Sequence, residues 1–152
     1  MIWYPYEQMK TMKAPYKILD AEGVHLYTKD QKLIDSISSW WCMIHGYKNK
    51  EINEAMKKQL DTLEHVIFAN FTHKPAITLC QRLIELLPKG KGLGKFNFAD
   101  NGSAAIEMSM KMSFQYHQQT GNSQKKRFMA LSDAYHGETI GALSVGACDL
   151  YS

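Results

Sequence analysis

The first part of the chain alternates apolar and polar side chains, which is the period of β-strands. Three such stretches are separated by two turns: strands at 16–19, 24–28 and 32–35, and turns at 20–23 and 29–30. A glycine in the first turn, Gly23, favours a tight reversal of the backbone. We therefore predict a small antiparallel meander near the N-terminus.

Three later stretches change to the helical period. The first covers 49–63, the second begins near Pro75 and ends before Pro88, and the third covers 104–116. In the third, apolar side chains form two adjacent stripes, Ala105, Met108, Met112 and Tyr116 in one and Ile106, Met110 and Phe114 in the other. A helix that is apolar around most of its girth is predicted to be buried on more than one side.

Short apolar runs on either side of the third helix, 96–99 and 126–131, predict two further strands. Strands joined through a helix make a βαβ unit, so we expect this pair to be parallel. Parallel sheets are covered on both faces and contain more than two strands. The predicted fold class is therefore α/β, and the chain is expected to end within a sheet of a larger protein.

The composition is that of a globular protein, with 45% hydrophobic and 22% charged residues. The length of 152 residues is enough for one domain with its own core. The net charge of +3 is scattered, which argues against a nucleic-acid partner, and no apolar run is long enough for a membrane span. Three cysteines, Cys42, Cys80 and Cys148, lie far apart and indicate reduced thiols of a cytosolic protein. The six histidines have no metal-binding spacing, so we predict no metal.

A turn at 100–103 joins the first of these strands to the third helix and has the chemistry of an anion site. Gly102 would let a ligand approach the backbone, and Ser103 offers a hydroxyl for capping or for a phosphate oxygen. The helix start adds N–H groups and partial positive charge. An ordinary capped connection between strand and helix explains the same residues, and neither of the two common nucleotide loops is present.

Four segments together resemble the class-III aminotransferases, pyridoxal-phosphate enzymes of fold type I: SSWWCMIHGY (38–47), NFTHKPAITLC (70–80), FADNGSAAIEMSMKM (98–112) and AYHGETIGALSVG (134–146). The resemblance covers nearly the whole chain but only about the first third of a family member. It implies the N-terminal part of the small domain at 1–46 and the start of the large, mostly parallel-sheet domain at 47–152. A cytoplasmic homodimer is implied for the full-length enzyme.

The resemblance also assigns residues to the cofactor, pyridoxal 5'-phosphate. Gly102 and Ser103 match the positions that hold its phosphate, and Tyr135 matches the aromatic residue that stacks on its ring and borders the substrate. His136 and Gly137 complete that loop. The turn has Asn101 before the glycine where serine is usual, and neither this nor other mild departures removes a phosphate donor or the ring.

Two further residues narrow the resemblance. Trp40, followed by Trp41 and IHGY, and Tyr6, in an N-terminal PY, match substrate-contacting positions of the branch that acts in biotin synthesis. That branch implies S-adenosylmethionine as amino donor and 8-amino-7-oxononanoate as acceptor.

The catalytic residues of the class are not matched here. The lysine that forms the Schiff base with the cofactor, the aspartate beside its ring nitrogen and an arginine for the substrate carboxylate are expected downstream, so the isolated chain is expected to be inactive. Two other interpretations stay open: a class-III aminotransferase for an ω-amino acid or a diamine, and a truncated, non-catalytic assembly module.

Overall fold

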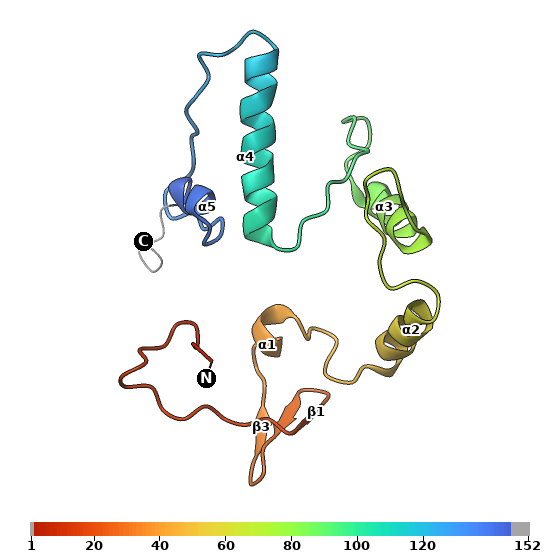
Figure 1. Cartoon of the computed structure of the whole chain (residues 1–152), viewed down its shortest axis with the longest axis vertical. Coiled ribbons are helices and arrows are strands. Elements are labelled where there is room, and N and C mark those ends of the chain that lie inside the picture. Colours follow the sequence, from red (N-terminus) through yellow and green to blue (C-terminus); the bar gives the residue numbers. More distant parts are fainter. Residues whose placement is uncertain (1, 147–152) are drawn as a thin grey trace. The chain divides into compact units, whose positions relative to one another are not determined.

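A computed structural model describes residues 2–146 (Figure 1). The chain divides between His73 and Lys74 into two compact units. The first unit contains the strands β1 (Asp20–Glu22), β2 (His25–Tyr27) and β3 (Lys32–Ile34) and the helices α1 (Ser38–Trp41) and α2 (Lys50–Leu60). The second unit contains the helices α3 (Lys74–Leu86), α4 (Gly102–Gln119) and α5 (Ile140–Ser144).

The predicted meander is confirmed as an antiparallel sheet in the order β1-β2-β3. Its first strand differs from the prediction, because residues 20–22 pair with β2 where a turn was expected. The reversal is made by two residues, Gly23 and Val24, and Gly23 has a φ of 58°. Glycine suits the first position of a two-residue hairpin loop because it tolerates positive φ. With so short a loop, the first strand lies closer to Gly23 than the predicted strand at 16–19. Only Leu19 of the predicted 16–19 strand reaches the ladder, through its N–H to Tyr27.

Helix α1 is a left-handed turn, which the sequence did not predict. Ser38, Ser39, Trp40 and Trp41 have φ values of 49°, 48°, 57° and 69°. The turn is closed by the Trp41 N–H, which donates to the Ile37 carbonyl at 2.8 Å. Residues with a Cβ are strained in this region, so the surroundings must hold the turn in place.

The three predicted helices are confirmed. Asn49 caps α2 by accepting the Ile52 N–H at 3.1 Å, and Pro75 lies in the first turn of α3, where proline is tolerated. In α4 the cap is Asn101, whose side chain accepts the Ala104 N–H at 2.8 Å.

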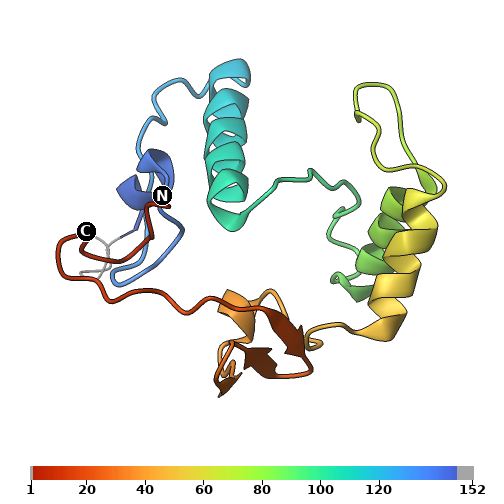
Figure 2. The same ribbon diagram turned by 60° about the horizontal axis from the view of Figure 1, so that its bottom comes forward.

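The prediction that α4 is buried on more than one side is wrong for the described chain. Met112 and Tyr116 are each 60% exposed, and α5 is the element packed against α4 in both views (Figures 1 and 2). The expected strands at 96–99 and 126–131 are irregular, because no neighbouring strand pairs with either of them within residues 2–146. A strand forms only when it is hydrogen-bonded to a neighbouring strand. Because these two segments form no sheet, the sheet that was expected to cover α4 is not there in the described part of the chain.

The expected single core is also absent from the described residues. Their buried hydrophobic side chains are Ala76 and Ala142, both small. Cys42 and Cys80 are free thiols, and Cys148 lies outside the described residues. None of the helices within 2–146 is long and apolar enough to cross a bilayer. No group of potential metal ligands occurs in the same range.

Candidate functional site

The start of α4 forms the centre of the candidate site. Its cap, Asn101, satisfies the Ala104 N–H with its side chain and the Ala105 N–H with its carbonyl, at 2.8 and 3.1 Å. The N–H groups of Gly102 and Ser103 are thereby left for an external acceptor. A Cβ at Gly102 would meet open space, so the backbone is accessible at this point. These features together suit an anion at the positive end of the helix dipole.

Ser103 ties this helix start to the loop at 135–138. Its Oγ accepts the Glu138 N–H at 3.2 Å, and a hydroxyl that accepts one bond still has its own hydrogen to donate. Gly137 lies directly against Ser103, with a φ of 119° and no room for a Cβ. A glycine is required here both by the conformation and by the close approach.

The loop that contacts Ser103 also carries an exposed aromatic ring. Tyr135 is 53% exposed, and its hydroxyl donates to the Glu138 carboxylate at 3.2 Å. His136 is half-buried, and Gly137 is buried. The five predicted cofactor residues therefore lie on two connected segments: Gly102 and Ser103 at the start of α4, and Tyr135, His136 and Gly137 on the loop that contacts Ser103.

Glu107 is a residue of this site that the sequence analysis missed. Its carboxylate accepts the Gly141 N–H at 2.8 Å, and a side chain at Gly141 would overlap it. The hydroxyl of Thr139, and then the backbone N–H groups of Gly141 and Ala142, lower the pKa of Glu107. The carboxylate thus caps α5 from the side of α4. The available signal was Thr139, a residue type that favours helix starts, with the small residues Gly141 and Ala142 in the turn after it.

In the first unit the structure brings together two of the three predicted substrate residues, Tyr6 and Trp40. Their rings are stacked, with centroids 5.8 Å apart and planes 8° from parallel. Each residue is 67% exposed, so the pair offers aromatic surface to a ligand. Such an arrangement can hold a flat group such as a purine.

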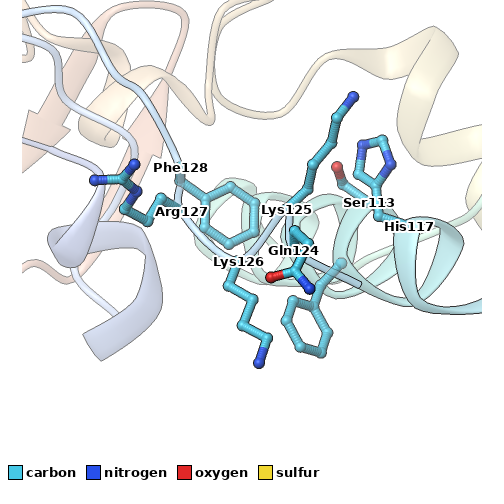
Figure 3. Close-up of a pocket in the computed structure, with 8 residues that line it drawn as sticks. Ser113, His117, Gln124, Lys125, Lys126, Arg127 and Phe128 are labelled. Atoms are coloured by element: carbon cyan, nitrogen blue, oxygen red, sulfur yellow. The ribbon is translucent and has the colours of Figure 1, made fainter. Parts of the chain in front are cut away.

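In the second unit a hollow of about 330 Å³ lies between the end of α4 and the segment that follows it (Figure 3). Three basic side chains at its edge, Lys125, Lys126 and Arg127, point in different directions (Figure 3). Because the cations do not converge, the hollow has no anion-binding geometry, and none of the predicted site residues lines it.

Comparison with known proteins defines the class. The family of class-III aminotransferases matches residues 6–151, and the chain belongs to that family. Two relatives, from Buchnera aphidicola subsp. Acyrthosiphon pisum and Helicobacter pylori, are each 43% identical and are both adenosylmethionine-8-amino-7-oxononanoate aminotransferases. The matches cover 95% and 99% of this chain, but 33% and 34% of the relatives. The chain therefore spans about a third of their length.

Solved structures agree with this family. The adenosylmethionine-8-amino-7-oxononanoate aminotransferase of Methanocaldococcus jannaschii superimposes with a TM-score of 0.88 at 35% identity, over 99% of this chain and 34% of its own. An amine transaminase from an uncultivated Pseudomonas species, solved with pyridoxal phosphate bound, gives 0.85 at 26% identity, over 99% of this chain and 34% of its own. The fold is that of the fold-type-I pyridoxal-phosphate aminotransferases, and this chain spans about a third of the two solved chains.

Proposed function

We propose that the chain is part of an aminotransferase of biotin biosynthesis. The enzyme would transfer an amino group from S-adenosylmethionine to 8-amino-7-oxononanoate, giving 7,8-diaminononanoate. The observation that carries this proposal is the seating of the 135–138 loop on Ser103, because it combines a phosphate-binding helix start with an exposed ring. The two relatives with that printed activity support the choice of substrates.

The residues present fit pyridoxal phosphate. The N–H groups of Gly102 and Ser103 and the Ser103 hydroxyl would hold the phosphate, and the Tyr135 ring would stack on the pyridine ring. Gly137 keeps the loop close enough to the helix start for both contacts, and His136 belongs to the same loop. When bound, the cofactor supplies an electron sink for the amino transfer, while these residues bind and orient it.

Substrate contacts are proposed for Tyr6, Trp40 and Tyr135. The stacked pair of Tyr6 and Trp40 would take the adenine of the donor, and Tyr135 would border the reacting group. The Schiff-base lysine and the remaining catalytic residues would come from the part of the relatives that this chain does not match. Residues 1–46 would belong to the small domain and 47–152 to the large domain of a cytoplasmic homodimer.

The test uses a full-length enzyme, either the natural product that carries this segment or a chimera in which it replaces the matching third of the Helicobacter pylori relative. Formation of diaminononanoate with S-adenosylmethionine as donor is measured. Trp40→Ala is expected to lower kcat/KM for the donor about tenfold or more, because one face of the aromatic pair is lost. Trp3→Ala, which removes an exposed tryptophan outside the pair, is the matched control.

The other functions give different results in the same assay. An enzyme that ignored S-adenosylmethionine and used β-alanine or putrescine would instead be an ω-amino-acid or diamine aminotransferase. A folded full-length protein without any aminotransferase activity would favour the non-catalytic module.

A further inference from the structure

The left-handed turn at 38–41 is the most strained segment in the described chain. Four consecutive residues have positive φ, and none of them is a glycine. Such residues normally visit this region singly, so a run of four needs strong support from its surroundings. Trp40, one member of the stacked aromatic pair, lies within the run.

Asp35 supplies that support. Its Oδ2 accepts the Ser39 N–H at 2.6 Å, and its Oδ1 accepts the Ile37 N–H at 3.2 Å. Successive N–H groups in a turn of this kind form a concavity that binds anions. Here the carboxylate of the same chain fills it, with charge-assisted hydrogen bonds.

A third bond connects the carboxylate to the sheet. The Tyr47 hydroxyl donates to Asp35 Oδ2 at 2.7 Å. Tyr47 is itself held by two backbone bonds to Gly23, at 3.1 and 2.7 Å, and so is tied to the β1–β2 hairpin. Asp35 directly follows β3, so one side chain links the sheet, Tyr47 and the strained turn.

The hydrogen bonds also keep the carboxylate ionised. The bond from the Tyr47 hydroxyl is the largest cause of a lowered pKa at Asp35, and the backbone N–H groups of the turn act in the same direction. The carboxylate therefore accepts hydrogen bonds at both oxygens throughout the neutral range.

We propose that Asp35 is a positioning residue that holds the left-handed turn and thereby places the Trp40 indole against the Tyr6 ring. Its importance for the amino donor rests on the proposed function. Its effect on the aromatic pair does not, and can be measured separately.

The first experiment measures the pair in the 152-residue chain at low concentration. Trp3→Phe and Trp41→Phe leave Trp40 as the single tryptophan, so the near-ultraviolet circular dichroism band of tryptophan reports its stacking on Tyr6. Asp35→Asn replaces one carboxylate oxygen by an NH2 group, which donates and cannot accept, and we expect it to remove most of the band. Tyr6→Leu gives the reference for an unstacked Trp40.

Two further variants make the result specific. Asp30→Asn changes an exposed acid in the β2–β3 turn of the same sheet and is expected to keep the band. Adding Ser39→Gly to Asp35→Asn removes the strain at one position of the turn, because glycine adopts positive φ freely, and is expected to restore part of the band. General destabilisation would not be rescued in this way.

A full band in Asp35→Asn, or an equal loss in Asp30→Asn, would overturn the proposal. If far-ultraviolet circular dichroism shows that Asp35→Asn does not fold, Tyr47→Phe decides the question, because it removes one partner of the carboxylate and leaves the other two. A smaller loss of the band in Tyr47→Phe supports the proposal, and no loss overturns it.

The second experiment measures the full-length enzyme. Asp35→Asn is expected to raise KM for S-adenosylmethionine about tenfold and to leave kcat nearly unchanged, with Ser39→Gly lowering KM again. If Asp35→Asn loses the tryptophan band but keeps the KM for S-adenosylmethionine, the proposed role of Asp35 in binding the donor is wrong. A wild-type enzyme without aminotransferase activity would instead contradict the proposed function, and the band would still decide the role of Asp35.

Discussion

Ser103 shows how one hydroxyl can serve a loop and a ligand together. It accepts the Glu138 N–H, and its own hydrogen stays available for a phosphate oxygen. This is possible because Asn101 caps the helix in its place. The two residues therefore divide between them the tasks that the sequence analysis gave to Ser103 alone.

The contact between the 135–138 loop and Ser103 is most sensitive to a substitution at Gly137. Gly137→Ala is expected to cost about 2–4 kcal/mol of local stability, from backbone strain and from overlap with Ser103. Hydrogen exchange at the Glu138 amide measures the detachment of the loop. In the full-length enzyme, affinity for pyridoxal phosphate is expected to fall with it.

Gly121→Ala is the matched control for this change. Gly121 also has a positive φ, 79°, but a Cβ there would meet open space. It therefore carries the strain without the overlap and is expected to cost about 1 kcal/mol. Equal effects of the two substitutions would show that Gly137 does not pack on Ser103.

At the scale of elements, α4 fixes the loop and α5 at two points one turn apart. Ser103 holds the loop at Glu138, and Glu107, four residues later on the same face, holds the start of α5 at Gly141. Two attachments on one rigid helix define the position of the loop better than either alone. The Tyr135 ring is thereby placed by a helix although it lies on a loop.

Glu107→Gln tests the second attachment. Loss of the charge is expected to speed hydrogen exchange at the Gly141 amide about tenfold, because hydrogen bonds to charged acceptors are the stronger ones. Glu85→Gln in α3 changes an exposed glutamate of the same unit and serves as control. Identical exchange at Gly141 in both variants would contradict a role for the carboxylate.

The same attachment depends on pH. The pKa of Glu107 is lowered in the folded chain, so the stabilisation is complete above the ordinary glutamate value of about 4.3 and is lost as pH falls through the lower folded value. In Glu107→Gln this acid-dependent part of the exchange rate is expected to disappear.

Prediction from sequence succeeded where the determining interactions are local. Periodicity located α2, α3 and α4, and a glycine marked the first hairpin, although its register was off. The strands at 96–99 and 126–131 were wrong because a strand needs a partner that the pattern does not reveal. The left-handed turn at 38–41 contains no glycine, so the sequence gives no sign of its positive φ values. The contact of Glu107 with Gly141 joins residues that are 34 positions apart, which a local pattern does not reveal. The roles of the site residues stay predictions.

At the scale of the whole molecule, the predicted residues fall into two groups, one in each unit. Tyr6 and Trp40 belong to the first, and the cofactor residues belong to the second. Large apolar side chains are exposed in both, among them Trp41 at 80%, Leu131 at 82% and Met129 at 98%. Exposed apolar surface on this scale marks contacts with further protein.

The isolated chain is therefore expected to associate or to precipitate. Analytical ultracentrifugation at increasing concentration measures this, and we expect species larger than the 17.4 kDa monomer. Addition of the part of the Helicobacter pylori relative that this chain does not match, as a separate polypeptide, is expected to reduce the association. A clean, stable monomer would contradict the prediction.

The contacts of Asp35 have a consequence for biosynthesis of the protein. All three partners of its carboxylate lie within twelve residues along the chain. Such low contact order favours fast formation, and proteins begin to fold from the N-terminus during synthesis. The strained turn can thus be completed on the ribosome as soon as Tyr47 has emerged, long before the cofactor site has been translated.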